Sequence, residues 1–299
     1  MLFHKPHHTN PGPRPTGPES PLDPFPQTFA NPAVCETDGK GSLGLTLLHS
    51  PQESEVDLIF VHGLGGNSKK TWTKDSLLSH FWPQDWLPRD SAFAKVRIHT
   101  YGYESPTLRG RRNILDIHDF GNQLLANISS SPYIAHSSTR IVIVAHSMGG
   151  LVSKKAFIMA NQDPMLRDLA GRFAAMYFLA TPHRGSALAN PLNRFLKMSS
   201  ERAYVGDLES TSQELRTIND QFRHYTTNLK LFSFYETLNS SYLGGLIVDS
   251  ESAVLGYPGE TQIRINADHR SICKFESPRD PNYILLRNAL ALTMVELTS

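Results

Sequence analysis

The sequence has little cysteine, no excess of charge of either sign and no long apolar run. Two cysteines, Cys35 and Cys273, occur in 299 residues, which excludes a fold built on disulfides and favours a reducing compartment. Lys and Arg together number 29, and Asp and Glu together number 28. The chain therefore lacks the excess of basic residues that is typical of nucleic-acid-binding proteins. Apolar stretches such as 173–180 are far shorter than the roughly 20 residues of a membrane-spanning helix.

The first 40 residues differ in composition from the rest of the chain. Nine of the 20 prolines lie within residues 1–32, and such a segment buries too little apolar surface to offset its ordering entropy. We therefore predict a disordered, proline-rich leader over 1–40. It has no basic-then-apolar signal and no arginine-rich transit helix, so we expect an intracellular, cytoplasmic protein.

Short apolar runs alternate with longer helical patterns over residues 41–299, which predicts one α/β domain. A mostly parallel central sheet flanked by helices follows from this alternation. Strands are predicted at 43–49, 56–62, 96–101, 140–145, 174–180 and 229–235, with a further short apolar run at 246–248. Helices are predicted around 74–82, 110–130, 149–161 and 206–225, and from Pro281 to about Leu297.

The most informative motif is Ala145-His146-Ser147-Met148-Gly149-Gly150, which directly follows the strand predicted at 140–145. A serine between small residues, at the junction of a strand and a helix, is typical of a nucleophile elbow. Ala145 stands where the strict pattern has glycine, and its methyl group is the smallest departure available. The competing interpretation is an ordinary strand-to-helix turn with an incidental serine.

A glycine-rich loop, His62-Gly63-Leu64-Gly65-Gly66, follows the strand predicted at 56–62. Glycines allow its N–H groups to turn inward, so we predict an oxyanion hole from the N–H groups of Leu64 and Met148. A phosphate-binding loop is the alternative, since Gly-Gly-Asn-Ser-Lys-Lys-Thr follows. Neither Lys69 nor Lys70 is preceded by the glycine that such a loop requires.

A serine nucleophile needs a general base, and three histidines follow Ser147 in the chain. His224 lies in a polar helical pattern, and His183 precedes any plausible acid. His269 lies after the last predicted strand and before the final helix. Hydrolases with a nucleophile elbow have the serine, the acid and the histidine in that order along the chain, which places the base here. We therefore predict His269 as the base.

Two carboxylates are candidates for the residue that orients His269. Glu236 ends the strand predicted at 229–235, and Asp249 ends the apolar run at 246–248. Both precede His269, so chain order does not choose between them. We favour Glu236, because the loop after the penultimate strand is the usual location of the acid.

Together these motifs resemble those of α/β-hydrolases of the serine-active-site-containing type, related to lipase-like proteins and GPI inositol-deacylases. The resemblance extends from about Leu43 to Leu297. The chain is also similar to the hydrolase modules of some fungal multidomain receptors. The resemblance implies an α/β-hydrolase fold, a triad of Ser147, Glu236 and His269, and an acyl-ester or lipid-like substrate. It also implies association with mitochondrial or endoplasmic reticulum membranes as an alternative location.

The stretch 187–228 is long enough for a helical lid insertion, with Leu188, Leu192, Phe195, Leu196 and Met198 at roughly helical spacing. These apolar residues could pack against the core of the protein, or they could make peripheral contact with a lipid surface, and the sequence leaves both alternatives open. We predict a serine esterase that needs no cofactor or metal, because no cluster has metal-ligand spacing. The alternative from another class is a binding or signalling module on the same scaffold.

Overall fold

The computed structural model describes residues 1–2, 41–74, 80–104, 117–183, 207–239 and 246–299, with only the backbone described for 207–212. Contacts divide the chain into Met1–Glu36 and Thr37–Ser299, and the elements described below belong to the second unit. The disordered leader predicted over 1–40 falls almost wholly outside the described residues and stays a prediction.

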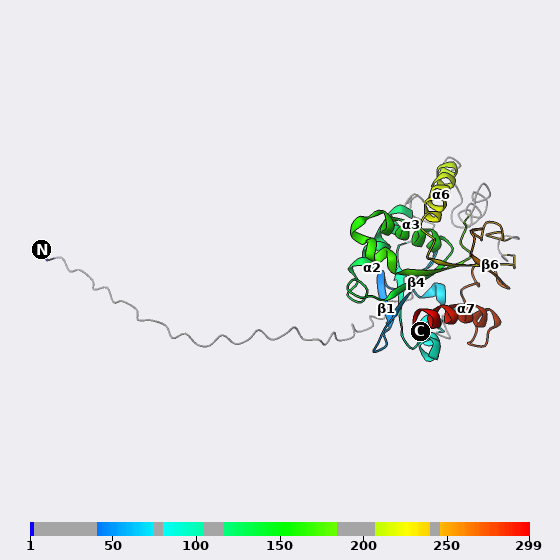
Figure 1. The fold of residues 1–299 in the computed structure, drawn as a ribbon, viewed down its shortest axis with the longest axis horizontal. Helices are drawn as coiled ribbons and strands as arrows, with labels where there is room; N and C mark the ends of the chain where they lie inside the picture. Colours follow the sequence, from blue (N-terminus) through cyan, green and yellow to red (C-terminus); the bar gives the residue numbers. More distant parts are fainter. Residues whose placement is uncertain (3–40, 75–79, 105–116, 184–206, 240–245) are drawn as a thin grey trace. The chain divides into compact units, whose positions relative to one another are not determined.

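Among the described residues, seven strands form one sheet in the order β1-β3-β2-β4-β5-β6-β7 (Figure 1). Strand β1 pairs antiparallel with β3, and all other neighbours are parallel. The strands are β1 (Gly44–His49), β2 (Val56–Val61), β3 (Val96–Gly102), β4 (Arg140–His146), β5 (Phe173–Leu179), β6 (Lys230–Glu236) and β7 (Thr261–Ile265).

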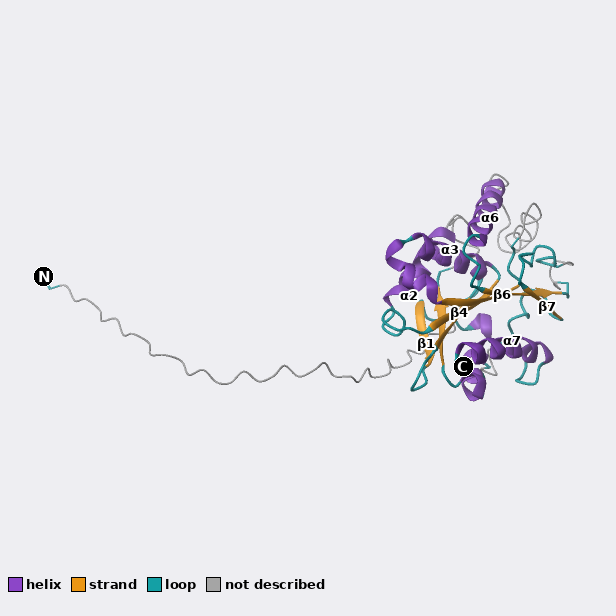
Figure 2. Ribbon diagram, in the orientation of Figure 1, coloured by secondary structure: helices purple, strands orange, loops and turns teal. Residues whose placement is uncertain are grey.

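Helices cover both faces of this sheet (Figure 2). They are α1 (Trp82–Asp85), α2 (Ile117–Ser130), α3 (Met148–Gln162), α4 (Arg167–Arg172), α6 (Asp207–Arg223) and α7 (Pro281–Leu297). Short 3₁₀ segments are η1 (Lys70–Trp72), η2 (Leu87–Arg89), η3 (Ser91–Phe93) and η5 (Pro164–Leu166).

Alternate residues of the buried strands enter two separate hydrophobic cores. On β2, Ile59 packs in the core shared with α2, α3 and α6, whereas Phe60 packs in the core shared with α1 and α7. Successive side chains of a strand point to opposite faces, so a strand covered on both sides must be apolar throughout. This explains why the central strands are near-continuous apolar runs in the sequence.

The predicted α/β architecture is confirmed, except that the sequence did not predict the last strand. Residues 246–248 do not form a strand; Ile247 and Val248 pack with Ala253 in a small cluster beside the sheet. The last strand is β7, whose polar residues are exposed because it is an edge strand. Most of the helix expected around 74–82 lies outside the described residues, at 75–79. Beside that stretch, Phe81 forms an isolated antiparallel bridge with Thr73 before α1 begins.

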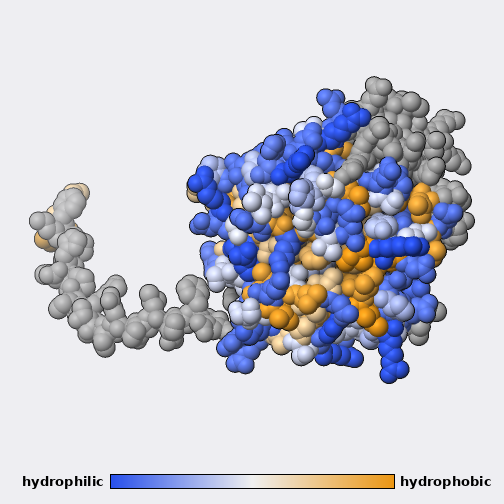
Figure 3. All heavy atoms as spheres, turned by 45° about the vertical axis from the view of Figure 1, so that its right-hand side comes forward, coloured by the Kyte–Doolittle hydropathy of each residue, from blue (hydrophilic) through white to orange (hydrophobic). Residues whose placement is uncertain are grey.

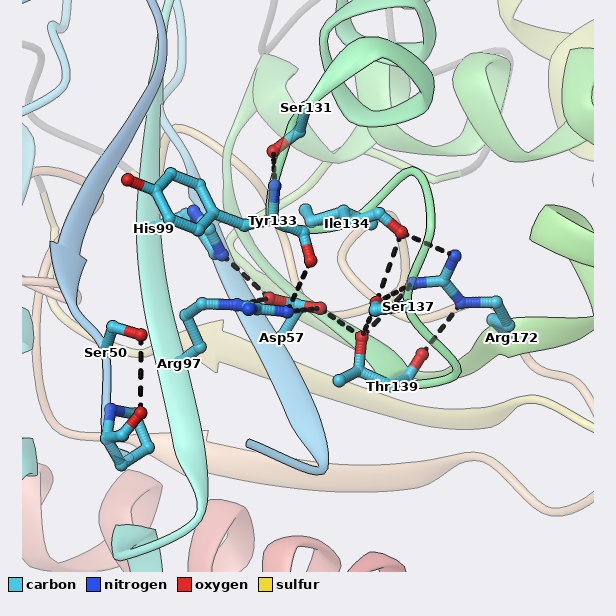
Figure 4. A network of polar contacts seen from close by, with 11 residues as sticks. Ser50, Asp57, Arg97, His99, Ser131, Tyr133, Ile134, Ser137, Thr139 and Arg172 are labelled. Carbon is cyan, nitrogen blue, oxygen red and sulfur yellow. Dashed lines mark hydrogen bonds and ion pairs between the residues drawn. The ribbon is translucent and has the colours of Figure 1, made fainter. Parts of the chain in front are cut away.

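A buried carboxylate organises the amino ends of the strands (Figure 4). Asp57 accepts hydrogen bonds from Arg97 Nε at 2.6 Å and from His99 Nε2 at 2.8 Å, and from the hydroxyl of Thr139. Arg172 donates to the Thr139 hydroxyl at 3.2 Å. Burial raises the pKa of Asp57, but the hydrogen bonds from His99 and Arg97 outweigh it and hold the pKa below its ordinary value.

Some apolar side chains reach the surface, among them Ile284, Leu285, Leu292 and Val295 on α7. Figure 3 shows apolar patches interspersed with polar side chains on one face of the molecule. Within the described ranges, no helix has both the length and the apolar character needed to cross a bilayer.

Candidate active site

Ser147 lies at a sharp turn where β4 ends and α3 begins. Its φ of 53° and ψ of −126° fall in a region that non-glycine residues rarely adopt, which costs on the order of 1–3 kcal/mol and must be held by the surrounding structure. The Ser147 N–H donates to the Leu179 carbonyl at 2.9 Å, and the Gly150 N–H donates to the Ser147 carbonyl at 3.0 Å. This is the local geometry of the predicted elbow.

Small residues flank the elbow because backbone passes close to it on both sides. A Cβ atom on Gly149 would lie 2.4 Å from the His62 carbonyl oxygen and 2.6 Å from that of Val61. Glycine is therefore required two positions after the serine. Two positions before it, Ala145 is completely buried, and the site accommodates its methyl group.

The structure brings His269 and Ser147 into contact at the carboxyl ends of the strands. His269 Nε2 lies 2.9 Å from Ser147 Oγ, although 122 residues separate the two in the chain. His269 is 1% exposed and Ser147 7%. A turn holds the histidine in place, in which the Asp268 carboxylate accepts from the N–H groups of Arg270 and Ser271.

Glu236, the last residue of β6, lies on the other side of His269. Its Oε1 is 3.3 Å from His269 Nδ1 and accepts from the Val248 N–H at 2.6 Å. The contact with histidine is longer than the roughly 2.7–2.9 Å of charge-assisted hydrogen bonds, and such contacts often tighten only when substrate binds. Asp249 instead accepts from the Ser252 N–H at 2.8 Å and holds a turn.

The loop that contains Leu64 lies against the elbow. A Cβ on Gly63 would lie 2.8 Å from Ser147 Cβ, so only glycine allows this approach. No hydrogen bond within the described part of the chain involves the amide nitrogen of Leu64 or of Met148. Both N–H groups therefore remain available to an oxyanion.

His62 determines the orientation of this loop. Its Nδ1 donates to the Gly63 carbonyl at 2.8 Å, and its Nε2 accepts from the Tyr103 N–H at 3.2 Å. Burial lowers the pKa of His62 to about 4, so the ring is neutral at pH 7 and can both donate and accept. Since the peptide is trans and planar, fixing the Gly63 carbonyl directs the Leu64 N–H the opposite way.

The other two histidines considered as the base have different environments. His183 is buried, and its Nδ1 lies 2.6 Å from Nζ of Lys154. His224 is exposed just after α6. In the described ranges, His, Cys, Asp and Glu side chains do not gather in any group that could hold a metal ion.

Sequence reasoning did not identify the supporting roles of His62, Tyr103, His146 and Lys154. Two of these positions could have been singled out in the sequence, because His62 directly precedes Gly63 of the glycine loop and His146 directly precedes Ser147. The lid predicted over 187–228 lies outside the described residues as far as 206. Its remaining part is α6, which buries Ile218 and Phe222 in the core, and the turn that follows.

Known proteins resemble this chain in sequence. A family model described as "Putative serine esterase (DUF676)" matches residues 52–240. Protein SERAC1 of Bos taurus is 28% identical over 257 residues, covering 77% of this chain and 38% of that protein. A triacylglycerol lipase of Burkholderia plantarii is 29% identical over 166 residues, covering 52% and 40%. The chain thus spans about two fifths of the length of these curated relatives.

Two solved structures show the same fold at low sequence identity. A lipase-esterase related protein from Clostridium acetobutylicum has a TM-score of 0.50 and 12% identity, covering 84% of this chain and 99% of that one. A fungal esterase from Rhizomucor miehei has a TM-score of 0.50 and 15% identity, covering 85% and 79%. The predicted α/β-hydrolase fold class is therefore confirmed.

Proposed function

The chain belongs to the DUF676 serine esterase family, and from that membership we propose that it hydrolyses acyl esters through an acyl-enzyme. One observation carries the proposal: Ser147 Oγ, His269 and Glu236 form a continuous line of contacts at the carboxyl edge of the sheet. A serine hydroxyl is a weak nucleophile near neutral pH, and a histidine oriented by a carboxylate is the arrangement that activates it.

In the first half of the reaction, Ser147 Oγ attacks the ester carbonyl carbon while His269 Nε2 takes the hydroxyl proton. Negative charge then develops on the carbonyl oxygen, where the N–H groups of Leu64 and Met148 stabilise it. Glu236 accepts the Nδ1 hydrogen of His269 and stabilises the imidazolium. When the tetrahedral intermediate collapses, His269 gives its proton to the leaving alkoxide and the acyl group stays on Ser147.

The second half repeats these steps with water. His269 Nε2 removes a proton from water as the oxygen attacks the acyl carbonyl, and the same two N–H groups hold the second oxyanion. Collapse of this intermediate breaks the bond to Ser147 Oγ, which recovers its proton from His269. The products are a carboxylic acid and an alcohol, and the protein returns to its starting state.

Labelling with a fluorophosphonate probe tests the nucleophile. We expect the folded wild-type chain to be labelled and Ser147→Ala not to be. Ser153→Ala is the matched control, because Ser153 lies in α3, which begins directly after Ser147, and donates to the Gly149 carbonyl at 2.7 Å; it should be labelled like the wild type. Absence of labelling in the folded wild-type chain would contradict the proposal and favour a binding or signalling module.

Kinetics of Glu236→Gln and Asp249→Asn test the acid. Both changes keep the size of the side chain and remove its charge. Loss of the orienting carboxylate leaves the base with the wrong tautomer, which costs on the order of 10⁴ in kcat. We expect that loss for Glu236→Gln and less than about a tenfold loss for Asp249→Asn. The reverse result would assign the role to Asp249.

We further propose a lipid-like acyl ester as the substrate, because one curated relative is a triacylglycerol lipase. Activity on emulsified long-chain esters should then exceed activity on soluble short-chain esters. The proposed contact with a lipid surface involves Phe195 and Leu196, which lie outside the described residues. Replacing both with serine should abolish stimulation by vesicles and leave short-chain hydrolysis unchanged; an equal loss on both substrates would indicate simple packing.

We also propose an intracellular location, because of the cysteine content of the chain. The chain has two cysteines, and Cys273 is a buried free thiol, as expected of a protein from a reducing compartment. Fractionation of cells that make the protein would check this, and recovery in the secreted fraction would contradict it.

A further inference from the structure

His146, the residue before Ser147, joins the nucleophile to the loop that contains His269. Its Nε2 lies 2.8 Å from the backbone carbonyl oxygen of His269. The two imidazole rings are tilted, with centroids 5.1 Å apart. The last residue of β4 is therefore bonded to the main chain of the residue whose side chain contacts Ser147.

The direction of this hydrogen bond follows from its acceptor. A carbonyl oxygen cannot donate, so the hydrogen must be on Nε2 of His146. Burial and the neighbouring His269 lower the pKa of His146 to about 3, so the ring is neutral at pH 7. A neutral donor beside His269 adds no positive charge when that histidine takes a proton.

His146 is also in close contact with the glycine loop. A Cβ on Gly63 would lie 2.8 Å from the His146 carbonyl oxygen and 3.3 Å from its Nδ1. The His146 residue thus lies between the loop after β2 and the loop after β7. A change at this position can alter the distance between the base and the nucleophile without touching either side chain.

We propose that His146 is a positioning residue, whose Nε2 hydrogen holds the His269 main chain so that the His269 imidazole meets Ser147 Oγ. The inference rests on the proposed hydrolase function and adds to it a second tie between the elbow and the base. The turn at Asp268 also restrains His269, so losing the His146 hydrogen bond displaces the imidazole rather than freeing it. Misplacement of about 1 Å can cost on the order of a hundredfold in rate.

The test compares two replacements of His146. Leucine fills much of the space but has no hydrogen to donate, whereas the side-chain amide of glutamine places a donor close to the Nε2 position. We expect His146→Leu to lower kcat for a soluble ester by about ten- to a hundredfold with KM within about twofold. His146→Gln should stay within about threefold of the wild type.

A buried histidine in the middle of β3 provides the control. His99 donates to Asp57, so His99→Leu, which removes that donor, should lower the melting temperature and leave kcat unchanged. The inference is overturned if His146→Leu keeps the wild-type kcat, or if leucine and glutamine cause equal losses. Failure of the hydrolase proposal looks different, because the wild-type chain would then show no turnover that Ser147→Ala abolishes.

Discussion

Replacing Lys154 with methionine should remove a pH dependence of stability that the wild-type chain has in alkaline solution. The Lys154 side chain is completely buried. Its Nζ lies 2.6 Å from both His183 Nδ1 and Asn219 Oδ1, and about 5 Å from the ring centres of Phe178 and Phe222. Asn219 Oδ1 accepts a hydrogen from Nζ, and a neutral amine can either donate to His183 Nδ1 or accept from it, so a neutral amine satisfies both partners.

Burial lowers the pKa of Lys154 well below its ordinary value, and the charge of Glu260 opposes this only in part. In the unfolded chain the lysine holds its proton up to its ordinary pKa of 10.5. Between the lowered folded pKa and 10.5, unfolding therefore takes up a proton. Stability rises with pH through this window, with a slope that approaches roughly 1–1.5 kcal/mol per pH unit for one proton.

Methionine has a similar length and no proton to exchange. It removes both hydrogen bonds of the Lys154 amine, which costs on the order of 1–3 kcal/mol for each lost partner, but it also removes the cost of discharging the lysine. The stability of the wild type relative to Lys154→Met should therefore rise with pH between the lowered folded pKa and 10.5, with a slope that approaches about 1 kcal/mol per pH unit. Taking the difference between the two proteins cancels the contributions of all other groups.

Urea unfolding followed by circular dichroism at pH 7, 8, 9 and 10 measures this difference. Lys155→Met is the matched control, because it removes the neighbouring, partly exposed lysine of α3 and leaves the buried cluster intact. A wild-type advantage over Lys154→Met that stays constant with pH would show that Lys154 keeps its proton in the folded protein. That result would refute the reasoning.

Two further predictions concern charge and packing. Asp57→Asn should cost about 3 kcal/mol at pH 7; the Asp57 contribution is present above the ordinary pKa of 3.8 and is lost as the pH falls through the lowered folded pKa. Acid unfolding curves of variant and wild type should therefore converge, and parallel curves would contradict this. Gly149→Ala should lower the melting temperature sharply, because its Cβ would meet backbone oxygens of Val61 and His62. Gly171→Ala, in α4 with no atom within 4 Å of its Cβ, should add about 0.5–1 kcal/mol; equal effects of the two alanines would refute the packing argument.

The strands were predictable to the extent that they are buried. Strands β2, β4 and β5 are covered on both faces, so their apolar runs are visible in the sequence, and alternation with helices then predicts a parallel sheet. Strand β7 was missed because an edge strand exposes its polar residues. The apolar run at 246–248 was misleading, because Ile247 and Val248 are buried in a small cluster with Ala253 and Tyr235 rather than in a strand.

The serine motif and the chain order of Ser147 and His269 are local or linear properties, and the sequence by itself determined them. The choice of carboxylate was different, since Glu236 and Asp249 both follow apolar runs and both precede the histidine. Only the tertiary structure separates them, because Glu236 pairs with Ile265 in the register of β6 and β7 and so lies beside the histidine loop.

The supporting contacts depend wholly on tertiary structure. The hydrogen bond from His146 to the His269 carbonyl joins residues 123 positions apart, and the contact between Lys154 and His183 joins residues 29 apart. No periodicity or motif encodes such a distance, because it results from the packing of strands and helices around two cores. Residue type and order at Ser147 thus come from the sequence, whereas the geometry that would make its hydroxyl reactive comes from the fold.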